Sequence, residues 1–527
     1  MYKRQNRLSS NIKTKYHYGY KPYEIPASVD FESTLIKSSN SKVIIETTYP
    51  NGQKSHQIAI TSWGGYALSS SFLTDIDNTN YWSINPFKFV KEALALEDIP
   101  MPDPTTEAGR RILFIHIDGD GFVEPVRMNM DMLSTEYLME PIFKKYKIPH
   151  TVSIIEGEIE ELFPKLTKRM EKDTRELYAL PWIEPASHTY SHPFFWAKVV
   201  LPKNRSPKVG KYFHLPIKDY YFSLKTETIG SINYALSLAP KSKRREKLLF
   251  WSGDCQPTKE ILAYIERQGI LSLNGGDTTV QKKNPTLAYI APFGLERGDY
   301  WQIYTGQQDE NVYTNDWLGP FWGFRNVIET YKMTNKPYRL KPIDLYYHFY
   351  SGSKLASLNA LKEVYEWVIK QKTSKLYTSQ YIKKGRGFYR TAIAKIKGGY
   401  EVCNSGFLRT VRFDKKISIN IKKSRGVAGF NFDNNSTYVS LDGSGEYKII
   451  LAKKTSLPYL IDSNGWVDKV TNSSFELKAN MPIEANFHLP KGCNFKTNIT
   501  IKSRQKHHLL SLSSKNKKEV TVVFKCK

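Results

Sequence analysis

Residues 111–122 read RILFIHIDGDGF, and this stretch decides the fold. Its apolar run from Ile112 to Ile115 leads into two aspartates, Asp118 and Asp120, each followed by a glycine. A short apolar run that ends in a polar, glycine-rich turn is typical of a buried strand in a parallel sheet. Functional groups of such sheets gather beyond the carboxyl ends of the strands, so the two aspartates are the first candidates for chemistry.

Similar apolar runs recur downstream, with helix-like segments between them. The patterns predict strands at residues 151–155, 248–251, 270–273, 287–290 and 342–347, and helices at 134–146, 259–267 and 354–370. The last helix carries apolar residues along one stripe, as a helix packed on a sheet does. Strands that alternate with helices favour a parallel sheet, either open or closed into a barrel.

The chain on either side of this region has a β-rich pattern. Before it, apolar residues at 43–45 and 58–60 flank Asn51-Gly52, a dipeptide that favours a hairpin turn. After residue 375 the helical periodicity disappears, and short alternating runs at 417–421, 438–441, 447–451 and 520–524 are typical of a β-sandwich. We therefore predict a small β-rich segment over 1–105, a distorted α/β barrel, (β/α), over 106–375, and an all-β sandwich-like domain over 376–527.

The net charge is strongly positive and unevenly distributed. The 527 residues carry 77 Lys and Arg against 51 Asp and Glu, a net of +26, and residues 376–527 alone hold 28 basic against 10 acidic side chains. Such a region could bind a polyanionic partner such as nucleic acid, an anionic glycan or a lipid surface. Alternatively, it is a lysine-rich surface that faces solvent and binds no partner. Because its lysines are scattered and not interleaved with stacking aromatics, we expect no nucleic-acid partner.

The rest of the composition excludes several classes of protein. Hydrophobic residues make up 40% and charged residues 24%, close to the globular average, so disorder is not expected. No apolar stretch reaches 18 residues and none follows the basic start, so we predict neither a transmembrane segment nor a signal peptide in this chain. Four cysteines are too few for a disulfide scaffold. One disulfide could form among Cys403, Cys493 and Cys526, but the sequence does not determine which two of them pair.

A second motif with chemical potential follows a strand-like stretch at 182–186. It reads HTYSH and places His188 and His192 four residues apart. On a helix these two would share one face, where their nitrogens could bind one cation. With Asp120 they supply two nitrogens and one oxygen, a set that leaves positions on zinc for water and substrate. Taken alone, the motif is equally a pair of surface histidines, and the two aspartates a plain polar turn.

Two further residues are candidates for proton transfer. His348 ends the apolar stretch 345–348, and an imidazole there is a candidate general acid because it titrates near neutral pH. Taken alone, a histidine there is more often a hydrogen-bonded residue near the core than a catalyst. Asp118 is the candidate base, because two carboxylates two residues apart on a loop can divide metal binding and proton transfer between them.

These motifs together resemble those of polysaccharide deacetylases of the carbohydrate esterase 4 type. Residues 188–192 match their H-[ST]-x-x-H metal motif, and residues 345–348 resemble their last motif. Asp118 and Asp120 differ from the adjacent aspartates common in that family. They are similar to one branch, the deacetylase region of the proteins that process the Pel exopolysaccharide of biofilms. Other stretches similar to this branch are 116–122, 187–193, 251–254, 274–277, 313–315, 319–320 and 341–343.

The resemblance, which extends from about Trp63 through the β-rich end, implies a deacetylase barrel and a set of roles. The implied metal ligands are Asp120, His188 and His192, holding a divalent metal, most simply zinc. The implied base is Asp118 and the implied acid His348. Asp254 and Trp317 are candidates for substrate contacts, the tryptophan by stacking on sugar rings unless it is a core aromatic.

The resemblance also implies a substrate and a location. It implies de-N-acetylation of an N-acetylhexosamine-containing exopolysaccharide in the periplasm or outside the cell, with that acetylated amino-sugar polysaccharide and other exopolysaccharide-export proteins as partners. Two alternatives stay open on sequence alone. One is a non-catalytic glycan-binding or scaffold protein, which the loss of a metal ligand would indicate; none is lost here. The other is a peptidoglycan- or chitin-type deacetylase, and the basic sandwich-like domain could bind carbohydrate under either.

Overall fold

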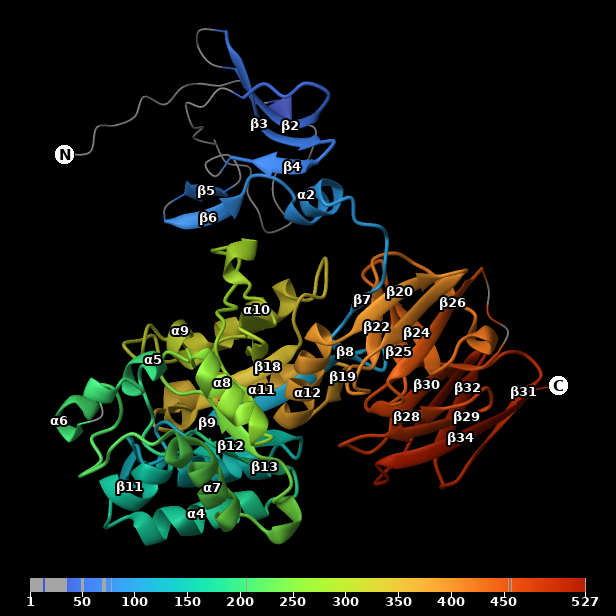
Figure 1. Ribbon diagram of the computed structural model, residues 1–527. Helices are drawn as coiled ribbons and strands as arrows, with labels where there is room; N and C mark the ends of the chain where they lie inside the picture. The colour runs from blue at the N-terminus through green and yellow to red at the C-terminus, as the bar shows by residue number, and fades with distance from the viewer. Residues whose placement is uncertain are drawn as a thin grey trace. The chain divides into compact units, whose positions relative to one another are not determined.

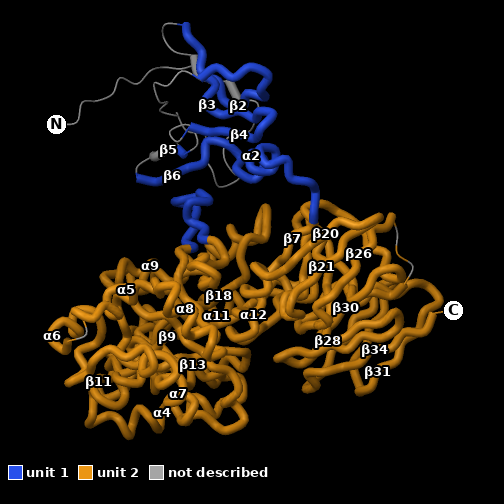
Figure 2. Tube along the Cα trace, in the orientation of Figure 1, with its two compact units in different colours: residues 1–99, 278–291 blue, residues 100–277, 292–527 orange. Residues whose placement is uncertain are grey.

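The computed structural model divides the chain into two compact units (Figure 2). One unit comprises residues 1–99 with 278–291, and the other comprises residues 100–277 with 292–527. The residues that the structure describes are 13–14, 36–48, 52–68, 73–76, 78–204, 206–453, 455 and 457–526. No helix in these described ranges is long and apolar enough to cross a membrane. All candidate site residues lie in the larger unit.

The smaller unit is built on an antiparallel sheet in the order β1-β2-β3-β4. Its elements are β1 (Lys13–Thr14), β2 (Lys42–Thr48), β3 (Lys54–Thr61), β4 (Gly64–Ala67), β5 (Leu73–Ile76), β6 (Thr79–Trp82) and α2 (Pro86–Ala93). The predicted hairpin is present, because β2 pairs antiparallel with β3. Of its turn dipeptide, Asn51 lies outside the described residues, and Gly52 has φ 81°.

One predicted strand is wrong in this unit. Residues 287–290 were expected to be extended, but Leu287–Tyr289 form a short 3-10 helix, η6. The Thr286 hydroxyl accepts a hydrogen bond from the amide of Ala288 and so caps this turn. A four-residue apolar run cannot by its pattern distinguish a strand from a helical turn, and the cap decides here.

The larger unit contains a parallel sheet in the order β15-β14-β13-β12-β9-β18. Strand β19 also pairs parallel with β9, and the short β8 pairs antiparallel with it (Figure 1). The strands are β8 (Thr106–Glu107), β9 (Arg110–Asp118), β12 (His150–Ile154), β13 (Ile183–Ser187), β14 (Leu248–Phe250), β15 (Leu271–Leu273), β18 (Ile343–His348) and β19 (Thr373–Lys375). All nine residues of β9 are buried, which explains its apolar run. No pairing among the described strands joins β15 back to β18, so closure into a distorted barrel stays a prediction.

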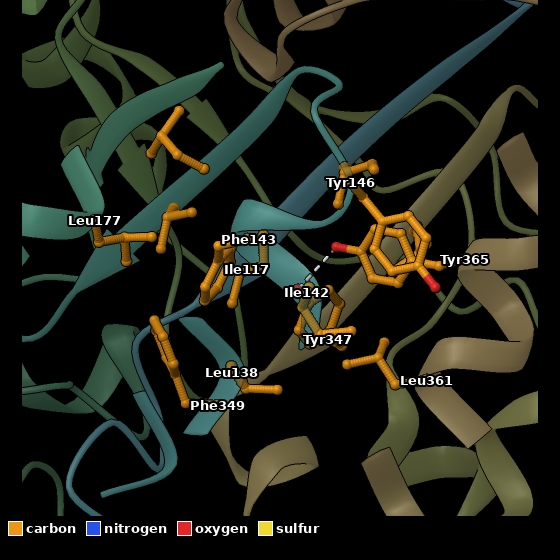
Figure 3. Packing of buried hydrophobic residues seen from close by; sticks show 14 of the residues in the cluster. Ile117, Leu138, Ile142, Phe143, Tyr146, Leu177, Tyr347, Phe349, Leu361 and Tyr365 are labelled. Carbon is orange, nitrogen blue, oxygen red and sulfur yellow. Dashed lines mark hydrogen bonds between the residues drawn. The ribbon is translucent and has the colours of Figure 1, made fainter. Parts of the chain in front are cut away.

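Helices cover one face of this sheet. They are α3 (Ser134–Leu138), the π-helix η1 (Met139–Lys144), α4 (Thr167–Ala179), α7 (Ser231–Leu238), α10 (Val327–Met333) and α11 (Leu355–Ile369). Leu113, Ile115 and Ile117 of β9 point into the apolar core that these helices form with the sheet. Figure 3 shows Ile117 beside Phe143 there. The helices predicted at 134–146 and 354–370 are thus confirmed, the first as an α-helix that continues as a π-helix.

Several further elements lie between the strands of the sheet. They are the hairpin β10 (Pro125–Val126) and β11 (Asn129–Leu133), the hairpin β16 (Gly294–Arg297) and β17 (Tyr300–Ile303), and the helices η2 (Glu158–Leu162), α5 (Trp196–Val199), α6 (Pro207–Gly210), η4 (Thr226–Gly230), α8 (Lys259–Arg267) and α9 (Glu310–Tyr313). Helix α8 has the predicted bounds, and its Ile261 and Ile265 belong to the same buried cluster as Leu249 of β14.

The opposite face of β9 packs against a helix that the sequence pattern did not predict. Helix α12 (Thr378–Tyr389) lies in the region expected to be all β, and its Tyr381 ring stacks on Phe114 with centroids 4.1 Å apart. Glycines in α12 hid its periodicity, because glycine is a poor helix former. Gly385 is required by close packing: a Cβ there would lie 2.7 Å from the side chain of Ile303. The region of the parallel sheet therefore continues past residue 375.

The remaining chain forms three sheets that pack face to face. An eight-stranded sheet has the order β32-β33-β30-β27-β24-β25-β22-β7. Its strands are β7 (Met101–Pro102), β22 (Thr410–Phe413), β24 (Val427–Asp433), β25 (Ser436–Leu441), β27 (Tyr459–Ser463), β30 (Glu484–His488), β32 (Lys502–Lys506) and β33 (Leu509–Ser513). Strand β7 lies in the segment expected to belong to the N-terminal part, but it pairs with β22.

Two four-stranded sheets complete this region. One contains β20 (Ala392–Ile396), β21 (Gly399–Cys403), β23 (Ser418–Ile419) and β26 (Glu446–Ala452), and the other β28 (Trp466–Val470), β29 (Ser474–Lys478), β31 (Cys493–Thr497) and β34 (Glu519–Cys526). Each shares a buried apolar cluster with the eight-stranded sheet, the packing expected of a sandwich. The disulfide left open by the sequence joins Cys493 to Cys526 across β31 and β34.

Candidate metal centre

The candidate residues meet at the carboxyl edge of the parallel sheet. Asp118 is the last residue of β9, His188 follows β13 directly, and His348 is the last residue of β18. The register pairs His348 with Asp118, so these two face each other across neighbouring strands. Together with Asp120 and His192 they line one cavity of about 580 Å³. The prediction that polar strand ends come together is confirmed for these five residues.

Asp120 lies between the two histidines of the second motif. One carboxylate oxygen is 3.0 Å from Nε2 of His188, and the other is 3.0 Å from Nε2 of His192. One ligand atom from each side chain lies within 4.8 Å of the other two, a spacing that could hold a metal ion. Burial works to raise the pKa of Asp120, but the two imidazoles outweigh it and hold the pKa well below its usual 3.8. The carboxylate is therefore ionised and available as a ligand.

The two histidines do not share a helical face, so that part of the prediction is wrong. Residues 188–192 form a loop in which Thr189 and His192 have φ of 75° and 51°. The Thr189 hydroxyl accepts a hydrogen bond from the His192 amide, and the carboxylate of Glu227 accepts those of Tyr190 and Ser191. This loop brings the two imidazole centroids to 4.9 Å.

The turn that follows Asp120 depends on glycine. Gly121 has φ 74°, and a Cβ on it would lie 2.2 Å from the ring of Tyr350. A side chain at this position would therefore displace Tyr350 or the turn. Because the turn carries Asp120 directly before Gly121, this close approach sets where the metal-ligand candidate lies.

Asp118 is held by two hydrogen-bond donors to which the sequence analysis assigned no role. Its Oδ2 accepts from Nδ2 of Asn274 at 2.8 Å and from the hydroxyl of Tyr346 at 2.7 Å. Its Oδ1 is buried without a hydrogen-bond partner and lies 3.7 Å from Nδ1 of His188. One oxygen of Asp118 is thus anchored, while the other is free to accept a proton near the Asp120 cluster.

His348 has a carboxylate partner that the sequence reasoning missed. Glu310, the first residue of α9, accepts the His348 amide at 2.8 Å and lies 3.1 Å from its Nδ1. Nε2 of His348 is 3.9 Å from carboxylate oxygens of both Asp118 and Asp120. Burial works to lower the pKa of His348, but the charges of Glu310, Asp309 and Asp120 outweigh it and raise the pKa well above 6.5.

The two candidates for substrate contacts differ in position. Asp254 lines the cavity, and its Oδ1 accepts hydrogen bonds from the amides of Trp196 and Gln256. Trp317 does not line this cavity itself. Its ring packs edge-on against Tyr350 at 5.4 Å, and Tyr350 is part of the wall.

The residues present fit a divalent metal. Two imidazole nitrogens and a carboxylate oxygen are the three-ligand set typical of catalytic zinc sites, which keep a further position open. Oδ2 of Asp120 lies 3.0 Å from Nε2 of His188 but is buried and makes no well-aligned hydrogen bond, so its charge is not fully compensated by the protein. An ion at Nε2 would compensate the buried carboxylate charge. The donor set supports a metal at this point without selecting zinc over other divalent ions.

Comparisons with known proteins add little. No family model matches the chain, and no curated protein matches it. One solved structure with some likeness is the crystal structure of 4-alpha-glucanotransferase from Thermococcus litoralis. It is 8% identical, with a TM-score of 0.32 over 79% of this chain and 99% of that one. A TM-score this low carries no argument about fold or function.

Proposed function

We propose that this chain is a divalent-metal-dependent deacetylase that hydrolyses the acetamide of N-acetylhexosamine units in a polysaccharide. The observation that carries the proposal is the grouping of Asp120, His188 and His192 in one cavity with a second carboxylate, Asp118, and with His348. Metal-dependent amide hydrolysis uses a Lewis acid, a base and an acid within reach of one bond, and this cavity offers candidates for all three.

Each side chain has a distinct part in the proposed reaction. Asp120, His188 and His192 hold the divalent metal, most simply zinc, which when bound supplies Lewis acidity for amide hydrolysis. Asp118 accepts the proton of the attacking water at Oδ1, the oxygen without a hydrogen-bond partner. The water oxygen bonds to the acetyl carbon, and the carbon–nitrogen bond then breaks.

His348 completes the reaction by giving a proton to the departing nitrogen. Its Nδ1 lies against Glu310, so Nε2 is the nitrogen that faces the cavity. Its raised pKa favours the protonated imidazole, the form that a general acid needs. The products are acetate and a free amino sugar, which balances the water consumed.

The shape around the cluster supports a polymeric substrate. Asp120, His192 and Tyr350 line the first cavity and also a second one of about 660 Å³. A chain of sugars could therefore occupy both sides of the reacting unit. We extend the proposal to an exopolysaccharide similar to Pel, to export proteins of the same system as partners, and to a periplasmic or extracellular location, all by the resemblance of the motifs.

The test is acetate release by the purified full chain loaded with zinc, from N-acetylhexosamine oligomers and from a chromogenic acetyl ester. Asp118→Asn should keep stoichiometric zinc and lose about 10²- to 10⁴-fold in kcat, since a general base contributes that much. Asp254→Asn is the matched control for zinc content, because this carboxylate lines the same cavity but lies outside the metal-ligand group. Full activity of Asp118→Asn, or no acetate release by the zinc-loaded parent, would refute the proposal.

A further inference from the structure

Behind Asp118 lies a buried chain of polar side chains for which the proposed reaction has no use. Nδ1 of His116 is 2.9 Å from Oδ1 of Asp344, and Nε2 of His116 is 3.2 Å from Oδ1 of Asn274. Nδ2 of Asn274 in turn donates to Asp118. His116, Asn274 and Asp344 have no exposed surface. The chain thus runs from Asp344 through His116 and Asn274 to the proposed base.

The strand register explains why these groups meet. Alternate residues of a strand point to one face, so His116 and Asp118 of β9 share a face. The register pairs His116 with Tyr346 of β18 and Asp118 with His348. Asp344 lies two residues before Tyr346 and so shares that face. Two neighbouring strands therefore place a column of polar side chains behind the cavity.

The hydrogen bonds determine which way the Asn274 amide points. Nδ2 of Asn274 lies 2.8 Å from Oδ2 of Asp118 and 2.9 Å from the carbonyl oxygen of Trp251, and both of these can only accept. Oδ1 of Asn274 must therefore face His116, and Nε2 of His116 must carry a hydrogen. A flipped amide would put its carbonyl oxygen against the Asp118 carboxylate.

The other nitrogen of His116 is equally constrained. Nδ1 faces Oδ1 of Asp344, and a hydrogen lies between them whichever of the two groups carries it. The second oxygen of Asp344 accepts the amide of Gly306 at 2.8 Å, which holds the carboxyl in place. The imidazole also stacks on Tyr346 with centroids 4.0 Å apart, so His116 contacts both donors to Asp118.

We propose that His116, held by Asp344, is a positioning residue that orients Asn274 and thereby keeps Oδ1 of Asp118 free and aimed at the metal-ligand cluster. This inference rests on the proposed function, because it assigns His116 a role only through Asp118. Positioning groups of this kind typically contribute 10- to 100-fold to activity when they hold a ligand or a base in place.

Substitution by phenylalanine tests this role with little disturbance of packing. A phenylalanine ring fits among Phe114, Phe250 and Tyr346, the ring neighbours of His116, but cannot donate to Asn274. His116→Phe should lower kcat about 10- to 100-fold with zinc stoichiometry and KM unchanged. His116→Gln, whose amide can still donate, should recover part of that loss.

His150 provides a matched control. It is also fully buried on a neighbouring strand, and its ring nitrogens contact the Ile148 carbonyl and the Tyr365 hydroxyl, away from the cavity. His150→Phe should lower the thermal midpoint while leaving kcat of the folded protein within twofold of the parent. If His116→Phe behaves like His150→Phe, with kcat unchanged, the proposal is overturned.

A double-mutant cycle separates positioning from general loosening of the fold. In the Asp118→Asn background there is no base left to orient, so adding His116→Phe should change the residual kcat by less than about twofold. Were the full 10- to 100-fold loss to recur in that background, His116 would act on something other than Asp118, and the proposal would fall.

A spectroscopic measurement tests the geometry without any activity. In full-length protein with ¹⁵N-labelled histidine, Nε2 of His116 should carry a slowly exchanging proton whose signal is absent in His116→Gln and shifted in Asn274→Ala. An unprotonated Nε2 would overturn the inference. Failure of the proposed function is recognised separately, as a parent protein that releases no acetate or an Asp118→Asn variant with full activity.

Discussion

Replacing Asp120 with asparagine removes the charge from the centre of the proposed metal site while nearly preserving the shape of the side chain. Each carboxylate oxygen of Asp120 is 3.0 Å from a different imidazole Nε2. In Asp120→Asn an NH₂ group replaces one of those oxygens. This group cannot bind a cation, and its hydrogens point at an imidazole. Losing only a hydrogen-bond partner of a ligand typically costs 10- to 100-fold in metal affinity, so losing the ligand charge should cost at least 100-fold.

The expected effect on stability follows from that change in affinity. Zinc at 100 times its Kd stabilises the folded protein by about 2.7 kcal/mol. At the same zinc concentration, a variant with 100-fold weaker affinity gains only about 0.4 kcal/mol. Since roughly 2–4 °C of thermal midpoint corresponds to 1 kcal/mol in a domain of this class, the zinc-induced shift should fall from about 5–11 °C to under about 2 °C.

The assay is thermal unfolding of the full chain with and without zinc, followed by circular dichroism and supported by metal analysis of the dialysed protein. Asp254→Asn serves as the control, because it removes a carboxylate from the same cavity without touching the three ligands. It should keep the full zinc-induced shift. An Asp120→Asn protein that keeps one tight zinc and the full shift would refute the ligand assignment.

Three further outcomes are expected. Glu310→Gln should move the alkaline limb of the pH–rate profile to lower pH. Burial lowers the pKa of His348 and the Glu310 charge raises it, so removing that charge should lower the pKa of the imidazole, whose protonated form is the active one. A pH series of kcat checks this. Phe143→Ala should lower the free energy of unfolding by about 3–5 kcal/mol in urea titrations, since this fully buried ring leaves a cavity in the core. Cys493→Ser should destabilise the C-terminal sheets by roughly 3–4 kcal/mol in differential scanning calorimetry, because its disulfide with Cys526 spans 33 residues, and zinc binding should be retained.

The strands that carry the site could be predicted from the sequence because their signal is local. The predicted runs at 112–115, 151–155 and 342–347 correspond to β9, β12 and β18 within a few residues. Once these strands are parallel, their carboxyl ends must lie at one edge, so the candidate residues that follow them meet. No long-range information is needed for that step.

The conformation around the histidine motif could not be predicted in the same way. A spacing of four residues suits a helix, but the loop from His188 to His192 is held by the carboxylate of Glu227, which is 36 residues from Ser191. The same holds for α12, where Gly385 is favourable because Ile303 of β17 lies too close to leave room for a side chain. Tertiary contacts override local propensity at both places.

The partners of the proposed base and acid also lie far away along the chain. Asn274 is 156 residues and Tyr346 is 228 residues from Asp118, and Glu310 is 38 residues from His348. A weak signal existed for Asn274, which follows the predicted strand at 270–273 and so belongs to the same sheet edge. Nothing comparable marks Glu310, which begins a helix of only four residues.

The polar residues within the apolar strands are themselves informative. His116 interrupts β9, and Asp344 interrupts β18, although every residue of both strands is buried. Burying such a pair gains little stability over apolar side chains of the same volume, because the cost of desolvation offsets the attraction. Apolar residues at both positions would serve a purely structural sheet at least as well. The hydrogen bond from His116, which Asp344 holds in place, instead fixes the orientation of the Asn274 amide. That orientation in turn determines which oxygen of Asp118 accepts a hydrogen bond and which stays free.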